Sequence, residues 1–186
     1  GKMSQVCAAI YTPEYNPQPG LLSGTFLGGT TELAVGRRII ERLRDGNYYG
    51  DKGLIRQHHD AFIKHIRALA AKHPDWFPAG HTYLDIVGGH GGMMRFTPFG
   101  GLKDPIMKLC RTLYDEGVIA FYCGHDPFHV RFLPPLGVMR LEQWPRVIEL
   151  LESAMAKVAA ALPAPKAPAI RPMHQPLSNN GAPARA

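Results

Sequence analysis

The sequence predicts an α+β fold in which helices cover one face of a mostly antiparallel sheet. Between residues 77 and 162, strand and helix patterns follow in the order strand–strand–helix–strand–strand–helix. Glycine-containing segments at 88–92 and 124–127 separate the paired strand patterns, as in tight connections between antiparallel neighbours. The helical patterns carry their apolar residues on one side, which is typical of helices that pack on a sheet.

The amino-acid composition is that of a globular protein and argues against several other classes. The chain has 186 residues, 45% hydrophobic and 19% charged, so it can bury a core. No apolar run approaches the roughly 20 residues that cross a bilayer, so we expect no membrane span. The net charge of +6 is spread out or lies in the tail, which argues against nucleic acid as a partner. Three widely spaced cysteines make no disulfide framework, which favours a reducing, cytoplasmic setting.

The first half of the chain predicts a strand, a loop and two helices. Residues 4–11 form a short apolar run typical of a buried strand, and the loop that follows at 12–30 is rich in proline and glycine. A threonine at 30 or 31 can cap a helix that extends to about residue 45. A longer helix is expected over 51–73, because apolar residues recur every three or four positions and Pro74 ends it.

The second half predicts the sheet. Four strands are expected, at 83–87, 93–97, 118–122 and 129–133. Asp104 can cap a helix between the second and third strands, and Gly117 can end it. A last helix is predicted over 142–162. The tail at 163–186 holds six prolines in 24 residues, and we expect it to be disordered.

Two patterns look like binding sites but lack the required spacing. The nine histidines include no set with the spacing of metal ligands, so no metal site is predicted. The glycines at 88–92 match neither a P-loop nor a dinucleotide-binding turn, because a strand and not a helix follows them.

Three residues remain as candidates for chemistry. Thr25 lies among glycines just before a helix, where hydroxyls and free amides suit an anion, although such a segment can also be a simple cap. Arg131 lies between apolar strand residues and needs a partner, either an internal carboxylate or that of a substrate. Lys2, taken alone, looks like a surface lysine.

Four segments in order resemble the C-terminal part of a class III, fold-type I aminotransferase. Within that class the resemblance is greatest to the lysine 6-aminotransferase and 4-aminobutyrate aminotransferase branch. Gly1–Cys7 resembles the segment that holds the cofactor-binding lysine, and Gly24–Gly29 the loop whose threonine reaches the cofactor phosphate. Gly89–Met93 resembles the turn that begins the small domain, and Val130–Leu136 the Arg-Phe-x-Pro-Pro-Leu motif.

The resemblance implies a function and roles for three residues. The activity would be transfer of an amino group between an amino acid, with a terminal amine, and a 2-oxo acid, with pyridoxal 5′-phosphate (PLP) as cofactor. Lys2 would be the catalytic lysine that forms the Schiff base with PLP, Thr25 a phosphate ligand acting on the partner subunit of a homodimer, and Arg131 the clamp for a substrate carboxylate.

The resemblance also implies a domain organisation. Residues 1–45 would be a remnant of the large PLP-binding domain, 46–76 a connecting helix and 77–162 the small domain. Family members run to more than twice this length, so an N-terminal portion would be missing. Gly88 departs from the family, which usually carries an arginine there. Two alternatives stay open: a non-catalytic interaction domain derived from the same scaffold, and a basic nucleic-acid-binding α+β module.

Overall fold

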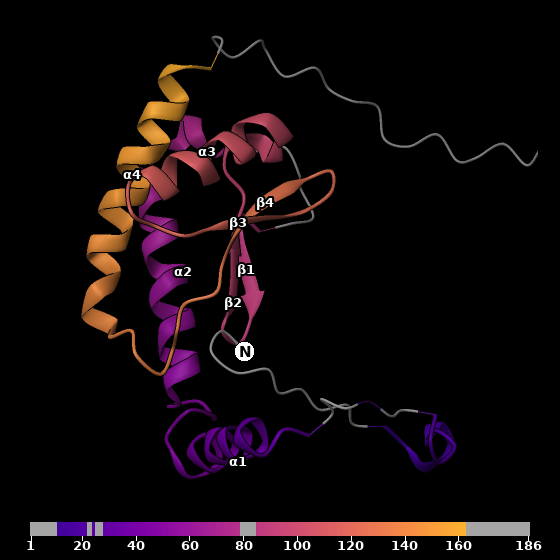
Figure 1. Cartoon of the computed structure of the whole chain (residues 1–186). Helices are drawn as coiled ribbons and strands as arrows, with labels where there is room; N and C mark the ends of the chain where they lie inside the picture. The colour runs from indigo at the N-terminus through magenta and orange to yellow at the C-terminus, as the bar shows by residue number, and fades with distance from the viewer. Residues whose placement is uncertain (1–10, 22–23, 25–27, 79–84, 163–186) are drawn as a thin grey trace, which may run out of the picture.

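The computed structural model describes residues 11–21, 24, 28–78 and 85–162. Four α-helices and four strands make up this part of the chain (Figure 1). In order they are α1 (Thr30–Asp45), α2 (Leu54–Lys72), β1 (Val87–His90), β2 (Met93–Phe96), α3 (Lys103–Asp115), β3 (Phe121–Gly124), β4 (Phe128–Phe132) and α4 (Trp144–Ala160). Lys2, Thr25 and the tail at 163–186 lie outside the described residues.

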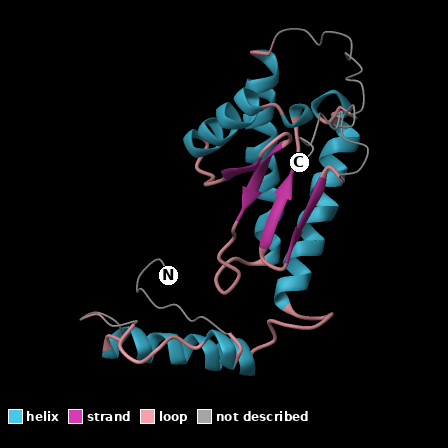
Figure 2. Cartoon of the chain, turned by 90° about the vertical axis from the view of Figure 1, so that its right-hand side faces the viewer, coloured by secondary structure: helices cyan, strands magenta, loops and turns pink. Residues whose placement is uncertain are grey.

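The strands form one antiparallel sheet in the order β1-β2-β4-β3. In Figure 2 the sheet faces the viewer, and α2, α3 and α4 lie behind it. α2 packs on β1 and β2, α3 packs on β3 and β4, and α4 packs on both of these helices. The predicted α+β fold, an antiparallel sheet with helices on one face, is therefore confirmed.

Alternation along the central strands places the core. Met94, Phe96, Val130 and Phe132 point to the helix side and are buried, while the residues between them point to the other face. Phe62 of α2 lies over this apolar row, with its ring centroid 5.9 Å from that of Phe132 and 6.4 Å from that of Phe96. These ring contacts pack α2 against β2 and β4, the two central strands.

Helix α1 lies apart from the sheet (Figures 1 and 2). Gly36 is its one buried residue, while the apolar side chains Leu33, Ile39 and Ile40 are exposed. An ion pair between Arg37 and Glu41 spans one turn of its surface at 2.8 Å. The described chain thus leaves the apolar side of α1 without a packing partner.

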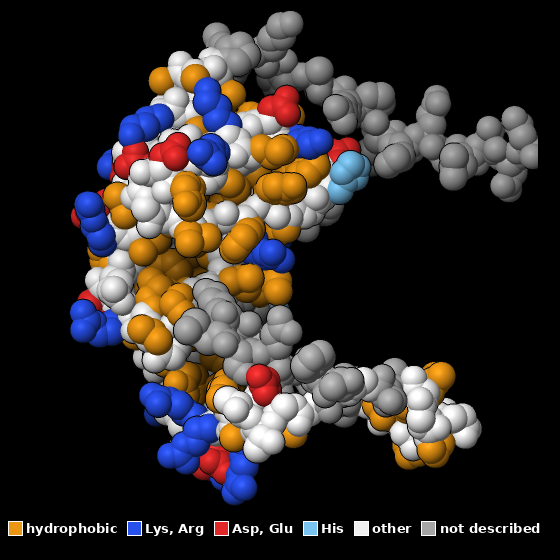
Figure 3. Space-filling model, viewed as in Figure 1, with side chains coloured by type: hydrophobic (Ala, Val, Ile, Leu, Met, Phe, Trp, Pro, Cys, Tyr) orange, Lys and Arg blue, Asp and Glu red, His pale blue; other side chains and the backbone are white. Residues whose placement is uncertain are grey.

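Apolar side chains also gather at the surface around α3 and β3 (Figure 3). Exposed here are Leu102, Met107, Tyr114, Phe121 and Tyr122. Single exposed apolar residues are common on protein surfaces, but here and on α1 several lie close together. Such groups are typical of surfaces that contact another part of a protein.

Two predicted caps are wrong, and one predicted turn differs in length. Gly29, and not a threonine, is the N-cap of α1, without a side-chain hydrogen bond, and Thr30 is already helical. Likewise Leu102 precedes α3, and Asp104 lies within its first turn. The predicted glycine turn is shorter than expected, because Gly88 and Gly89 pair with Arg95 and Met94 as part of β1.

Glycine is required at one of these strand positions. Gly89 has φ +123°, and a Cβ there would overlap the carbonyl oxygen of Met93 on the neighbouring strand. A sequence pattern treats glycine as a turn former, but here its missing side chain permits a close approach of two strands. Of the strand predicted at 83–87, residues 83 and 84 lie outside the described residues, and the strand that the structure describes is Val87–His90.

Candidate functional site

Arg131 lies at the centre of the sheet. It occupies β4, an inner strand, and pairs with Arg95 of β2 on one side and Phe121 of β3 on the other. Antiparallel partners point to the same face, and these alternate with the buried core residues, so all three project from the face without helices (Figure 2). The row continues to Gly88 of β1, the partner of Arg95.

The guanidinium of Arg131 has no ionic partner among the described residues. Its Nε is buried and makes no hydrogen bond within the described chain. Its Cζ lies 5.7 Å from the ring centroid of Phe121, a distance at which the aromatic face attracts a cation. No internal salt bridge to Arg131 is therefore found among the described residues, and none of them gives its guanidinium a carboxylate acceptor.

Arg95, by contrast, is held by neutral acceptors. Its Nη1 donates to the backbone oxygen of Asp85 at 3.1 Å and, over a longer 3.4 Å, to Oγ1 of Thr97. Its Nη2 lies beside Gly88, where an added Cβ would stand 3.0 Å away. The side chain therefore extends toward β1, whereas that of Arg131 extends toward β3.

The nearest acid to Arg95 is already engaged. Asp85 accepts a hydrogen bond from Arg67 at 2.7 Å and one from the backbone N–H of Val87 at 3.2 Å. Burial opposes the ionisation of Asp85, but these bonds and the charges of Arg67 and Arg95 outweigh it and hold its pKa below the usual value. The carboxylate thus stays ionised and paired with Arg67, and it leaves Arg131 uncompensated.

A polar contact between Thr97, just after β2, and His129 of β4 links the two central strands near the arginines. Oγ1 of Thr97 lies 2.8 Å from Nδ1 of His129, which is buried. If Thr97 accepts from Arg95, its own hydroxyl proton can go to His129. Sequence analysis missed Arg95, Thr97 and His129 as a connected group, because their proximity depends on the pairing of β2 with β4.

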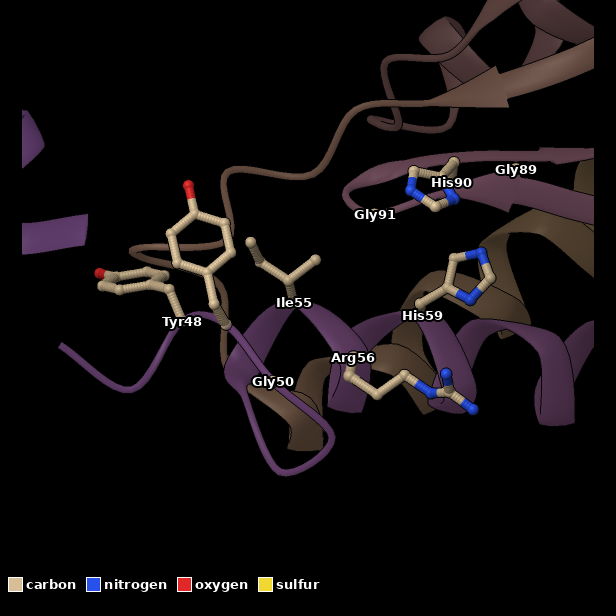
Figure 4. A pocket seen from close by; sticks show the side chains of 9 residues that line it. Tyr48, Gly50, Ile55, Arg56, His59, Gly89, His90 and Gly91 are labelled. Carbon is tan, nitrogen blue, oxygen red and sulfur yellow. The ribbon is translucent and has the colours of Figure 1, made fainter. Parts of the chain in front are cut away.

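A cavity of about 330 Å³ lies elsewhere, between the start of α2 and the β1–β2 turn (Figure 4). His59 of α2 and His90 of β1 line one end of it and Tyr48 the other, with Ile55 between them. Nε2 of His59 is buried and has no hydrogen-bond partner in the described chain. Arg131 does not line this cavity, so the structure does not join the two features.

Two further findings concern the described residues. They contain no group of three or more histidine, cysteine or acidic side chains that could hold a metal ion. None of their helices combines the length and the apolar character needed to cross a membrane.

Comparison with solved structures finds the same fold in several aminotransferases. Lysine aminotransferase from M. tuberculosis superposes with a TM-score of 0.56 and 28% sequence identity, over 75% of this chain. The fold is that of a class III aminotransferase. Two more distant class III aminotransferases share the fold alone. Ornithine δ-aminotransferase from Plasmodium falciparum has 18% identity and a TM-score of 0.55 over 78% of this chain and 34% of its own. Ornithine aminotransferase from Toxoplasma gondii, with PLP at partial occupancy in its active site, has 17% identity and a TM-score of 0.52 over 77% and 31%.

The likeness to class III aminotransferases is partial in length. The chain spans 29% of the M. tuberculosis enzyme. No family model matches the sequence, and a sequence search of curated proteins finds no match.

Proposed function

We propose that this chain is part of a PLP-dependent aminotransferase subunit that moves an amino group between an amino acid with a terminal amine and a 2-oxo acid. The fold shared with lysine aminotransferase supports amino-group transfer as the general chemistry. The finer assignment rests on the sequence motifs and on the residues that carry them.

The observation that carries the proposal is the unpaired guanidinium of Arg131. A buried, unsatisfied Nε on a rigid inner strand costs stability unless a ligand supplies the acceptor. Guanidinium and carboxylate match in a two-pronged geometry, and both substrates of an aminotransferase carry a carboxylate. Arg131 would therefore bind and orient either substrate by the same group.

The residues proposed for the cofactor fit its chemistry. The amine of Lys2 can bond covalently to the PLP aldehyde, and the hydroxyl of Thr25 can donate to its phosphate. α1 begins with Gly29 as its N-cap and without a side-chain cap hydrogen bond, and the amides at a helix N-terminus favour an anion such as a phosphate. When bound, PLP supplies an electron sink for charge at the substrate carbon. Lys2 Nζ would take the proton from that carbon and pass it to the C4′ carbon of the cofactor, which the transfer of the amino group requires.

The assembly belongs to the same proposal. Thr25 would act across a homodimer interface, and the protein would work in the cytoplasm. Residues 1–45 would belong to the large PLP-binding domain and 77–162 to the small domain, with 46–76 connecting them. The exposed apolar side of α1 is compatible with burial against the rest of such a subunit.

Covalent PLP labelling tests the proposal. The chain, completed by the rest of the subunit, is incubated with PLP, reduced with borohydride and digested, and the labelled lysines are located by mass spectrometry. We expect preferential labelling of Lys2, lost in Lys2→Ala and unchanged in Lys108→Ala, which removes an exposed lysine of α3. Equal labelling of all surface lysines would contradict a PLP site at Lys2.

A kinetic test concerns Arg131 in an enzyme completed by the rest of the subunit. Arg131→Lys keeps the charge but loses the two-pronged geometry, at a cost of about 1.5–3 kcal/mol. We expect kcat/KM to fall about ten- to a hundredfold for substrates that carry a carboxylate. An equal fall for amines without a carboxylate would identify Arg131 as a structural residue.

A further inference from the structure

Two arginines stand directly opposite each other on the uncovered face of the sheet. Arg95 and Arg131 are register partners on β2 and β4, and neither makes an ion pair among the described residues. Like charges at opposed positions of an antiparallel pair destabilise the sheet. The repulsion is reduced because the guanidinium of Arg95 extends toward β1 and that of Arg131 toward β3.

The position of Arg95 is fixed by its surroundings. Gly88 leaves the space that its guanidinium occupies, and the Asp85 carbonyl and Thr97 hydroxyl hold one of its nitrogens. These acceptors are neutral, so they orient the side chain without cancelling its charge. The nearest carboxylate, that of Asp85, is paired with Arg67, so Arg95 adds positive charge to the uncovered face on the strand next to Arg131.

We propose that Arg95 is a specificity-determining residue that strengthens carboxylate binding at Arg131 through its charge. This inference rests on the proposed role of Arg131 as a carboxylate clamp. Arg131 supplies the hydrogen bonds, because its buried Nε has no other acceptor in the described chain. Arg95 supplies a second positive charge from the adjacent strand. Its own Nη1 is already hydrogen-bonded to the backbone oxygen of Asp85, so it acts through its charge and not through a hydrogen bond to the carboxylate.

The test uses acetate as the probe and the side-chain N–H signal of Arg131 as the readout. The Nε–H resonance is assigned by its absence in Arg131→Lys, and acetate is titrated at constant ionic strength by NMR. We expect Kd for acetate to rise about fivefold in Arg95→Met, equivalent to about 1 kcal/mol. Arg95→Lys should stay within twofold of the wild type, since the charge is retained.

Arg146→Met is the matched control, because it removes an exposed arginine of α4 whose ion-pair partner, Glu149, lies on the same helix. It should leave acetate binding within twofold of wild type. Raising ionic strength should weaken binding more in the wild type than in Arg95→Met, since the removed charge is the screened one. Unfolding curves of each variant confirm that the chain still folds.

The possible outcomes separate the two proposals. No acetate response of Arg131 in the wild-type chain would overturn both the clamp and this inference. A normal response that persists unchanged in Arg95→Met would overturn the role of Arg95 alone. An equal loss in Arg95→Lys and Arg95→Met would assign the effect to the bonds with Asp85 and Thr97, and would also overturn the charge role.

Discussion

The indole N–H of Trp144 donates a hydrogen bond to Nδ1 of His58 over 3.1 Å, inside the core between α4 and α2. Both side chains are almost completely buried. Because Nδ1 accepts this bond, the ring is neutral and its proton is on Nε2. His58 is thus a structural residue that joins the two helices.

This bond makes stability depend on pH. Burial lowers the pKa of His58, although the Met139 backbone and the charge of Glu142 oppose the shift. Its contribution is complete above the unfolded pKa of about 6.5, and it is lost as the pH falls below that value and the unfolded chain takes up the proton. In urea unfolding, the wild type should therefore lose more stability between pH 7.5 and 5.5 than His58→Gln.

His65→Gln, on the same helix but only partly buried, is the control for that measurement. It should keep the pH dependence of the wild type. If His58→Gln kept it as well, another group would be responsible for acid sensitivity.

The two strand glycines should respond differently to alanine. Gly89→Ala introduces a Cβ at positive φ against a backbone oxygen, and should cost about 2 kcal/mol or more. Gly88→Ala places its Cβ 3.0 Å from Nη2 at the end of the Arg95 side chain, which needs to shift by only a few tenths of an ångström, and should change stability by less than about 0.5 kcal/mol. Equal effects on the free energy of unfolding would show that the close approach of β1 and β2 is not limiting.

Arg131 should be replaceable without loss of stability. Arg131→Met keeps the apolar stem and removes a buried Nε that has no partner in the described chain. We expect the free energy of unfolding to stay equal or to rise by up to about 1 kcal/mol. Thr97→Val, which breaks the bond to His129, should instead cost about 1 kcal/mol. A clear loss of stability in Arg131→Met would favour a structural role.

Cys110 should react slowly with alkylating reagents. Burial, with a smaller effect of the neighbouring Cys123, raises the pKa of its thiol to about 11. At pH 8 about one molecule in a thousand then carries the reactive thiolate. Iodoacetamide labelling of the Cys110 peptide, followed by mass spectrometry, should be about a hundredfold slower in the folded chain than in denaturant. Similar rates would show that α3 opens readily.

Local patterns predicted the helices well. The spacing of Phe62, Ile66 and Leu69 indicated the buried side of α2, and the helix ends at Lys72, close to the predicted residue. These signals depend on neighbours three or four positions apart. The cap of α3 was wrong because Asp104 had the preferred residue type, whereas the chain enters the helix two residues earlier.

The site could be predicted only in part. Arg131 was identified because its strand neighbours are apolar, and Arg95 lies in a similar context between Met94 and Phe96. What the sequence does not contain is the register that sets the two arginines opposite each other. Lys2 and Thr25 stay predictions, since they lie outside the described residues.

The sheet order also determines when the arginine pair can form during folding. β3 and β4 are joined by a short connection and can pair early, as can β1 and β2. Pairing of β2 with β4 closes a long loop that contains α3, and such closure is slow because of its entropic cost. The two hairpins can therefore exist separately before the charges are brought together. Mutual repulsion of Arg95 and Arg131 then acts on the joining of the hairpins, and an anion that screens it should speed that step.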